Sequence, residues 1–253
     1  MRFEEFPLDP TVLDSLRAAN YVEATPIQAQ TIPIVLEGHD LIALAETGSG
    51  KTAACAIPLC HLVDLSSFHI QVLIVVPTRE LALQYSTEAQ KVGKIKGVKL
   101  FAIFGGEDID LQLAKLKSGV HILVATPGRL IDLIYSRRID LTHVKTLVFD
   151  EADQMLGMGF IEDLEFIMDC LVQDHQTLLF SATMPKEIRL IAKNYMNKPK
   201  ELLLITGKPA PSNLSHQFFF CQNPRHKTED LIALLKKVDP AQCLIFSNSR
   251  REV

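Results

Sequence analysis

Short apolar runs alternate along the chain with longer, more polar segments. From residue 41 onward, the runs rich in Val, Ile and Leu are 41–45, 71–76, 100–104, 121–125, 146–149 and 177–180. Near-continuous apolar runs of this length are typical of strands buried on both faces. The segments between them are long enough for crossover helices. The pattern therefore predicts an α/β fold in which helices cover a parallel sheet.

The same criteria predict helices, turns and strands in the rest of the chain. Ahead of the first run, the pattern predicts a helix over 11–19 and turns over 20–26; after the last, a helix over 186–194 and a strand over 201–205. The Gly/Pro/Ser-containing stretch at 206–212 is typical of a linker. Beyond it we expect a strand at 217–221, a helix at 227–237 and a strand at 243–246. Two strands and a helix cannot enclose a core, so this piece is interpreted as the start of a second domain.

The composition agrees with a folded chain and limits the cellular compartment in which we expect it. Apolar residues make up 47% and charged residues 22%, as in ordinary globular proteins. No apolar run approaches the ~18 residues that a membrane span needs, and the first residues lack a signal-peptide pattern. We therefore expect a cytoplasmic protein that contacts no membrane. The five cysteines form no C-x-x-C pair and are expected to be reduced, mostly buried thiols.

The charge is unevenly distributed. The net charge of −4 gives no overall case for a nucleic-acid partner. Residues 1–90 hold 4 Lys and Arg against 11 Asp and Glu, whereas residues 91–253 hold 22 against 19. Lys91, Lys94, Lys96 and Lys99 fall within nine residues that include no acid. Such a cluster is more often a solvated surface than a binding site, and both interpretations stay open.

A glycine-rich loop follows the run at 41–45. The pattern G-x-x-x-x-G-K-[ST] is matched at every fixed position except the first, where the chain has Ala45. Gly48 and Gly50 let backbone N–H groups point inward around phosphate oxygens. Lys51 supplies charge for the β- and γ-phosphates, and the Thr52 hydroxyl can bind Mg²⁺. The sequence therefore predicts a nucleotide phosphate site at the start of a helix.

An acidic pair follows the run at 146–149. In a phosphate-loop enzyme an acid at this place holds Mg²⁺, usually through water, and Asp150 is the candidate. Glu151 is placed to orient the water that attacks the γ-phosphate. Taken alone, such a pair is more often the charged N-terminus of a helix. Its combination with the phosphate loop favours the catalytic interpretation.

These residues carry a family resemblance. Residues 150–153 spell the D-E-A-D motif of the DEAD-box ATP-dependent RNA helicases, and 45–52 resemble their motif I, which commonly begins with alanine. Residues 24–28 resemble the Q motif, with Phe3 lying 25 residues before Gln28. Further segments resemble motif Ia, the glycine doublet and motifs Ib, III and IV, at 77–82, 105–106, 126–129, 181–183 and 244–248. The resemblance covers essentially the whole chain.

The resemblance implies an architecture and a set of ligands. It implies a RecA-like P-loop NTPase domain over 1–205, with the Q motif at 3–28 and a mostly parallel sheet covered by helices on both faces. A linker over 206–212 and a truncated second RecA-like domain over 213–253 would follow. ATP and Mg²⁺ are the implied ligands, with Thr52 and, through water, Asp150 holding the metal. A monomer is expected.

Residue roles follow from the same resemblance. Gln28 would read the adenine edge while Phe3 stacks on the ring. The phosphates would lie against Ala45, Glu46, Thr47, Gly48, Ser49, Gly50, Lys51 and Thr52. The catalytic set would be Lys51, Asp150, Glu151, Ser181 and Thr183, and the nucleotide site would be coupled to RNA through Asp153, Ser181 and Thr183. One RNA strand would be gripped by its sugar–phosphate backbone, with little sequence preference, at Pro77, Thr78, Arg79, Gly105, Gly106, Thr126, Pro127, Gly128 and Arg129.

The function implied is RNA-stimulated ATP hydrolysis coupled to local unwinding of duplex RNA, and the implied partner is single-stranded or duplex RNA, bound by its sugar–phosphate backbone. The 253 residues contain no H-R-x-G-R-x-G-R segment, which in the family supplies arginine fingers worth ~10³–10⁵ in rate. This chain alone is therefore expected to hydrolyse ATP poorly and not to unwind. An ATP-gated RNA clamp that does not unwind would keep the same motifs and stays open. A small-molecule P-loop kinase is disfavoured by Gln28 and by the acidic motif.

Overall fold

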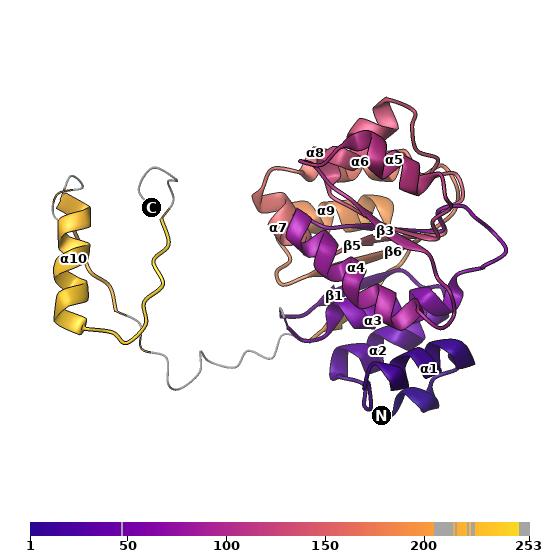
Figure 1. Ribbon diagram of the computed structural model, residues 1–253, viewed down its shortest axis with the longest axis horizontal. Coiled ribbons are helices and arrows are strands. Elements are labelled where there is room, and N and C mark those ends of the chain that lie inside the picture. Colours follow the sequence, from indigo (N-terminus) through magenta and orange to yellow (C-terminus); the bar gives the residue numbers. More distant parts are fainter. Residues whose placement is uncertain (47, 205–214, 216, 222, 224–225, 248–253) are drawn as a thin grey trace. The chain divides into compact units, whose positions relative to one another are not determined.

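The computed structural model describes residues 1–46, 48–204, 215, 217–221, 223 and 226–247 (Figure 1). Thr47 and the predicted linker at 206–212 lie outside the described residues. The chain divides into two compact units, Met1–Thr206 and Gly207–Val253.

A sheet of seven parallel strands forms the centre of the first unit, in the order β3-β4-β2-β5-β6-β1-β7. The strands are β1 Leu41–Leu44, β2 Val72–Val75, β3 Leu100–Ile103, β4 Ile122–Ala125, β5 Thr146–Phe149, β6 Gln176–Ser181 and β7 Lys200–Leu203. The six apolar runs from residue 41 to 180 are thereby confirmed as strands. The expected strand at 201–205 is present as β7, which begins one residue earlier and ends at Leu203; residue 205 lies outside the described residues.

Helices cover both faces of this sheet (Figure 1). They are the 3₁₀ turn η1 Phe3–Glu5 and the α-helices α1 Pro10–Ala18, α2 Pro26–Leu36, α3 Lys51–Leu62, α4 Arg79–Gly93, α5 Ile109–Leu116, α6 Pro127–Tyr135, α7 Ala152–Gly157, α8 Ile161–Asp169 and α9 Lys186–Tyr195. The helices expected over 11–19 and 186–194 are confirmed as α1 and α9. The α/β fold with a helix-covered parallel sheet is confirmed.

The central strands supply both hydrophobic cores. Along β2, Ile74 packs into the core that includes α1 to α4, whereas Leu73 and Val75 pack into the core that includes α6, α8 and α9. Successive side chains of a strand point to opposite faces, so a strand covered on both sides must be apolar throughout. This requirement explains why the strands were visible in the sequence as unbroken apolar runs.

The second unit departs from the expected elements. Its helix is present as α10 Lys227–Val238, but the described residues 217–221 and 243–247 form no strand, so both strand predictions are wrong for this structure. A strand persists through hydrogen bonds to a neighbouring strand and through burial of one face. Here Phe220 and Phe246 are 93% and 87% exposed, and α10 buries none of its residues.

Two further observations bear on expectations from composition. All five cysteines are free, but only Cys55 and Cys60 are buried, so the expectation of mostly buried thiols is wrong. Cys170 is half-buried, and Cys221 and Cys243 are exposed. Among the described helices, none combines the length and the apolar character needed to cross a membrane.

The parallel strands bring the chemistry to one edge of the sheet. Apart from Phe3 and Gln28, which precede β1, the residues predicted to be functional follow β1, β2, β3, β4, β5 and β6. The carboxyl ends of parallel strands lie at the same edge of the sheet. Four helices begin there, α3, α4, α6 and α7, immediately after Gly50, Thr78, Thr126 and Glu151. Helix N-termini carry partial positive charge and free N–H groups, so this edge favours anions.

Candidate active site

A pocket of about 370 Å³ opens at this edge of the sheet. It is lined by residues of the phosphate loop, α2, α4 and the acidic segment after β5: Tyr21, Gln28, Gly48, Gly50, Lys51, Thr52, Ala53, Val76, Leu81, Gln84, Tyr85, Glu88, Asp150 and Glu151. The structure therefore brings the predicted phosphate loop, the Q-motif glutamine and the acidic pair into one cavity.

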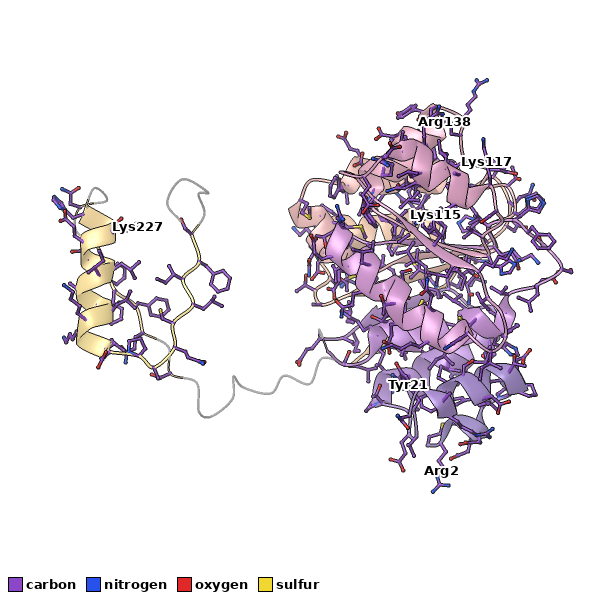
Figure 2. All side chains as sticks on the ribbon, in the orientation of Figure 1. Arg2, Tyr21, Lys115, Lys117, Arg138 and Lys227 are labelled. Atoms are coloured by element: carbon purple, nitrogen blue, oxygen red, sulfur yellow. The ribbon has the colours of Figure 1, made fainter. Side chains whose placement is uncertain are left out.

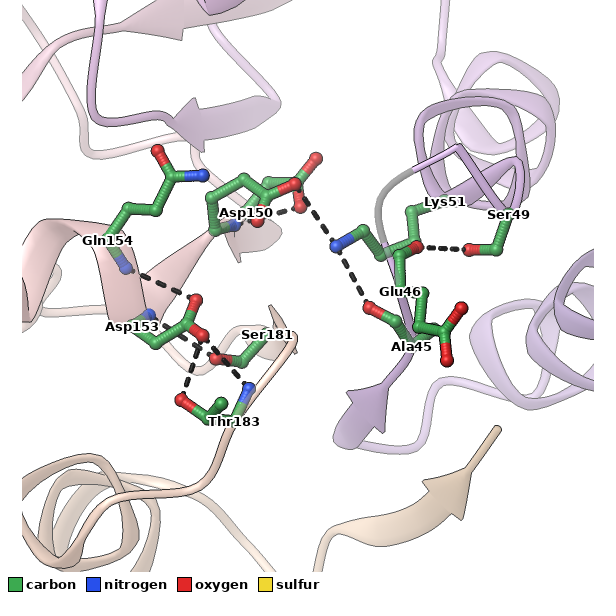
Figure 3. Close-up of polar contacts among 10 residues, drawn as sticks. Ala45, Glu46, Ser49, Lys51, Asp150, Asp153, Gln154, Ser181 and Thr183 are labelled. Carbon is green, nitrogen blue, oxygen red and sulfur yellow. Dashed lines mark hydrogen bonds and ion pairs between the residues drawn. The ribbon is translucent and has the colours of Figure 1, made fainter. Parts of the chain in front are cut away.

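The phosphate loop turns sharply at its two glycines. Gly48 and Gly50 have φ values of 79° and 95°, a backbone conformation that glycine adopts without strain. A Cβ on Gly50 would lie 2.8 Å from Nε2 of Gln28, so a side chain at this position would also displace the Gln28 amide. The Ser49 hydroxyl donates to the Glu46 carbonyl at 2.8 Å and closes the turn (Figure 3).

Lys51 lies in the floor of the pocket and is almost fully buried. Its Nζ donates to the Ala45 carbonyl at 3.1 Å and lies 3.1 Å from Oε1 of Glu151 (Figure 3). The Thr52 hydroxyl comes from the next residue of α3 and lines the same cavity. A lysine held in this way presents its charge to the cavity at a defined place.

Asp150 and Glu151 form the opposite wall and are both buried. Burial, together with the neighbouring charges of Glu151 and Asp153 and against the pull of Lys51, raises the pKa of Asp150 to about 6. Glu151 has φ 55° and ψ 46°, a left-handed conformation that is strained for a residue with a side chain. Its N–H donates to Oδ1 of Asp150 at 2.9 Å. Strained backbone and a shifted pKa within one cavity are features of catalytic sites.

The two residues predicted to bind the base lie in different surroundings. Gln28 lines the pocket, accepts from the Thr25 N–H at 2.9 Å and donates to the Gly50 carbonyl at 3.4 Å. Phe3 is 2% exposed and does not line the pocket. The Tyr21 ring packs edge-on to the Phe3 ring, with 5.9 Å between the ring centres, and the Tyr21 side chain lines the pocket together with Gln28.

Tyr21 and Glu88 are pocket residues that the sequence analysis did not identify. The Tyr21 hydroxyl donates to the Glu88 carboxylate, which also pairs with Lys91 at 2.8 Å. This contact ties the segment before α2 to helix α4. The available signal was an aromatic residue seven positions before Gln28, on the same turn-rich segment.

Asp153 connects the acidic segment to the residues after β6. Its Oδ2 accepts hydrogen bonds from the Thr183 N–H at 2.9 Å and from the Thr183 hydroxyl at 2.8 Å (Figure 3). Its own N–H donates to Ser181 Oγ at 3.3 Å. The structure brings these three residues together, and Ser181 also accepts the Ala45 N–H through its carbonyl at 3.0 Å. These hydrogen bonds join the segments that follow β1, β5 and β6.

The residues predicted to grip RNA lie along the same edge, on the side of β2, β3 and β4. Arg79 pairs with Oε1 of Glu107 at 2.8 Å and lies over the Phe104 ring at 4.7 Å. Arg129 donates to the Glu107 carbonyl at 3.0 Å and to Gln112 at 2.9 Å. Glu107 therefore holds both guanidinium groups beside the glycine doublet, and we call this surface the RNA edge.

The other residues of the RNA edge lie mostly at the starts of helices or are exposed glycines. Thr78 caps α4 by accepting the Leu81 N–H at 3.2 Å, and Pro77 is buried. Thr126 and Pro127 begin α6, and Gly128 is exposed in its first turn. Gly105 and Gly106 are exposed, and Gly106 has φ 84°. Thr47 lies outside the described residues.

Comparison with known proteins places this geometry in a family. The family model for the DEAD/DEAH box helicase matches residues 25–191. An ATP-dependent RNA helicase CshA from Listeria monocytogenes is 46% identical over 252 residues, which cover 100% of this chain and 48% of the relative. A DEAD-box ATP-dependent RNA helicase CshA from Bacillus subtilis is 43% identical, with 99% and 51% covered. The chain spans about half the length of the curated relatives it matches.

Solved structures agree. A DEAD box protein from Methanococcus jannaschii superposes with a TM-score of 0.79 at 39% identity, covering 93% of this chain and 63% of that one. A hypothetical ATP-dependent RNA helicase from Sulfolobus tokodaii superposes with a TM-score of 0.72 at 36% identity, covering 77% and 57%. The RecA-like architecture expected from the sequence is confirmed by these neighbours and by the sheet described above.

Proposed function

Because the chain belongs to the DEAD/DEAH box helicase family, we propose that it is the nucleotide-binding part of an ATP-dependent RNA helicase. In this role it binds ATP in the pocket described above and grips RNA along the RNA edge. Residues 1–205 are the ATP-binding domain, 206–212 a linker and 213–253 the beginning of a second domain. The observation that carries the proposal is the pairing of Lys51 with Glu151 inside a pocket closed by a phosphate loop.

The phosphates of ATP are bound by the loop and by the N-terminus of α3. Backbone N–H groups beside Gly48 and Gly50 donate hydrogen bonds to the phosphate oxygens, and the N-terminus of α3 adds favourable positive charge. Lys51 approaches the β- and γ-phosphates by exchanging its contacts with Ala45 and Glu151. Once Lys51 is on the phosphates, the Glu151 carboxylate is released to orient a water molecule for attack.

The donor set also fits Mg²⁺. A threonine hydroxyl and a buried carboxylate, Thr52 and Asp150, line the same small cavity. Oxygen ligands of this kind, with water completing the shell, are the ones that Mg²⁺ prefers. The bound ion would neutralise charge on the phosphate oxygens. Negative charge at Asp150, which burial disfavours, would be compensated by it.

The adenine is bound by Tyr21 and Gln28. Tyr21 lines the pocket, whereas Phe3 packs behind it and is buried. We therefore assign ring stacking to Tyr21 and a supporting role to Phe3. Gln28 is held between Thr25 and the Gly50 carbonyl, so its amide presents hydrogen-bonding groups in a fixed orientation and also senses the phosphate loop.

The coupling of ATP to RNA is assigned to Asp153, Ser181 and Thr183. Their hydrogen bonds join the segment that carries Glu151 to the segment that follows β6. RNA backbone phosphates would meet Arg79, Arg129 and the N-termini of α4 and α6. These contacts involve no base edges, so little sequence preference is expected. The monomeric state and the cytoplasmic location stay predictions from the sequence.

Strand displacement tests the proposal against the alternative of an ATP-gated RNA clamp. The measurement uses a short RNA duplex with a chain extended to the full length of its relatives. ATP-dependent release of the displaced strand supports a helicase. ATP-dependent retention of single-stranded RNA without any displacement supports the clamp. Phosphorylation of a metabolite, with indifference to RNA, would contradict both.

A further inference from the structure

A second basic surface lies away from the nucleotide pocket. It is a groove of about 740 Å³ between the last turns of α4 and α5 and the start of β3. Four lysines line it together with Gln90 and Phe101: Lys91, Lys94, Lys99 and Lys115. Lys115 is labelled in Figure 2. We call this surface the basic groove. It lies at an edge of the sheet, because β3 pairs only with β4 in the described sheet.

The charge of the basic groove is largely unneutralised. None of the residues that line it is acidic. Lys91 pairs with Glu88 at 2.8 Å, but within the described part of the chain no carboxylate lies within 4.0 Å of the Nζ of Lys94, Lys99 or Lys115. Three uncompensated ammonium groups around one hollow favour an anionic ligand.

Lys96 lies among these lysines in sequence but does not line the groove. Lys96 is 9% exposed, lies 3.8 Å from Asp9 and donates to the His61 carbonyl, so it ties the end of α4 to other elements. The cluster at 91–99 is therefore neither a uniform solvated surface nor a uniform binding site. Three of its members face the groove, and Lys115 joins them from α5.

Aromatic side chains accompany the lysines. The Nζ of Lys115 lies 5.2 Å from the centre of the Phe101 ring, and that of Lys99 lies 5.2 Å from the centre of the Phe68 ring. Phe101 lines the groove and is half-buried. Phe68 lies outside the groove lining, so Phe101 is the aromatic residue that lines it. Lysines beside an accessible aromatic ring form the type of surface that follows a single nucleic-acid strand without reading its sequence.

Two elements run from the RNA edge to the basic groove. Helix α4 begins at Arg79 and carries Lys91 and Lys94 in and just beyond its last turn, about 18–22 Å away at ~1.5 Å per residue. Strand β3 has Lys99 just before it and Gly105 just after it, about 20 Å apart at ~3.3 Å per residue. A strand with ~3.4 Å between stacked nucleotides spans that distance with about six nucleotides.

We propose that the basic groove is a second contact for the sugar–phosphate backbone of the RNA strand that leaves the RNA edge. The inference rests on the proposed function and extends it. The groove would lengthen the bound stretch of RNA by about six nucleotides. It would also hold the flanking RNA while the nucleotide site acts on the strand at the RNA edge.

RNA length and salt separate this contact from the RNA edge. Binding of a 6-nucleotide and a 14-nucleotide single-stranded RNA is measured by fluorescence anisotropy from 50 to 200 mM salt. The test variant is K94Q/K99Q/K115Q, and the matched control, K145Q/K193Q/K200Q, removes the same charge from exposed lysines outside the groove. ATP affinity and thermal denaturation of each variant report on its fold.

The wild type should bind the longer RNA at least tenfold more tightly than the shorter one. The groove variant should lose that gain while keeping its affinity for the short RNA. On a single strand, the logarithm of the affinity falls with the logarithm of the salt concentration by ~0.7 per phosphate contact. Between 50 and 200 mM salt, three contacts account for a roughly 20-fold weakening of binding. The groove variant should therefore lose roughly 20-fold less affinity for the long RNA over this range than the wild type does. The control variant should resemble the wild type.

Several results would overturn the inference. One is that the groove variant keeps the wild-type affinity and salt dependence for the long RNA. Another is that the control variant loses as much RNA affinity as the groove variant. A wild type that binds the short RNA but gains nothing from length sinks this inference alone. A wild type that binds neither RNA contradicts the proposed function as well. Loss of polyglutamate binding with RNA binding intact would identify the groove as a site for an acidic protein instead.

Discussion

The Nζ of Lys51 lies 3.1 Å from Oε1 of Glu151, and both side chains line the pocket and are almost completely buried. The same ammonium group donates to the Ala45 carbonyl. A phosphate that approaches Lys51 must therefore compete with the Glu151 carboxylate. That carboxylate becomes free only when the phosphate has taken its place at Lys51. In the proposed function, this exchange would couple nucleotide binding to the release of Glu151, the residue assigned to orient the attacking water.

Glu151→Gln should separate binding from hydrolysis. The amide keeps the shape of the side chain but removes the charge that competes for Lys51 and repels phosphate. ATP affinity should be retained or rise, by up to about tenfold for ~1.4 kcal/mol, while hydrolysis by the extended chain falls at least 100-fold. Calorimetric titration with ATP and phosphate-release kinetics measure the two effects. Glu201→Gln, an exposed control on β7, should change neither.

Normal hydrolysis by Glu151→Gln would remove Glu151 from its assigned role. A loss of ATP affinity would contradict the competition at Lys51. The two outcomes are independent, because one concerns the attacking water and the other concerns the phosphate loop.

Tyr21 and Phe3 should have distinct effects on nucleotide binding. Stacking of a base on an aromatic side chain is worth ~1–3 kcal/mol, so Tyr21→Ala should weaken ATP binding about tenfold or more. Tyr21→Phe should largely preserve it, although the bond to Glu88 is lost. Phe3→Leu should lower thermal stability, because Phe3 is buried, and leave ATP affinity nearly unchanged. A folded Phe3→Leu variant that loses as much affinity as Tyr21→Ala would restore Phe3 as the stacking residue.

These aromatics show what the sequence could and could not provide. The strands were predictable because burial on both faces leaves an unbroken apolar signature, as in Val72–Val75. The phosphate loop and the acidic pair were predictable because their chemistry depends on residues close together in sequence. The Q-motif resemblance assigned Phe3 to the adenine ring and gave Tyr21 no role. Only the packing reveals that Tyr21 lines the pocket, whereas Phe3 is buried against it.

Contacts between residues far apart in the sequence were the other feature that the sequence did not predict. Glu107 holds Arg79 and Arg129 from a loop 28 residues after the first arginine and 22 before the second. Lys96 turns away from the lysines around it because Asp9 and the His61 carbonyl meet it there. The segments 217–221 and 243–246 carry strand-forming sequence, yet their described residues form no strand, because pairing depends on partners that local sequence does not specify.

Glu107→Gln should strengthen RNA binding modestly. The Arg79–Glu107 pair is exposed, with side chains 44% and 46% accessible, and such pairs are worth ~0.2–1 kcal/mol. Releasing Arg79 and removing a negative charge from the RNA edge should raise the affinity for a short RNA by about two- to fivefold. The hydrogen bond from Arg129 goes to the Glu107 carbonyl and survives the change. Glu80→Gln removes the same charge from the first turn of α4 as a control.

Weaker RNA binding by Glu107→Gln would mean that Glu107 positions Arg79 for RNA and does not restrain it. An equal gain in Glu80→Gln would mean that only the overall charge matters. Anisotropy at one fixed salt concentration is enough to distinguish these outcomes.

Asp150→Asn should stabilise the fold at neutral pH. The pKa of Asp150 is raised to about 6 by burial, from a model-peptide value of about 3.8, so the folded state disfavours its charge. The resulting cost is fully present above about pH 6 and disappears as the pH falls through that value towards 4. The variant should exceed the wild type by a few kcal/mol at pH 7.5, and the difference should shrink towards pH 4.5. Urea denaturation at both values measures it.

Asp174→Asn, which changes an exposed acid, controls for general charge effects. A variant that is less stable than the wild type at pH 7.5 would mean that attraction to Lys51 outweighs the desolvation of Asp150. A stability difference that grows towards pH 4.5 would contradict the sign of the pKa shift.

RNA-stimulated phosphate release tests the central claim most directly. The rate is measured at saturating ATP, with and without single-stranded RNA, for these 253 residues and for a chain extended through the second RecA-like domain to the length of its relatives. We predict strong stimulation by RNA in the extended chain and a rate at least ~10³-fold lower in the 253 residues alone, because the arginine fingers are missing from them. RNA-stimulated turnover of equal rate in the two chains, or an extended chain indifferent to RNA, would contradict the account.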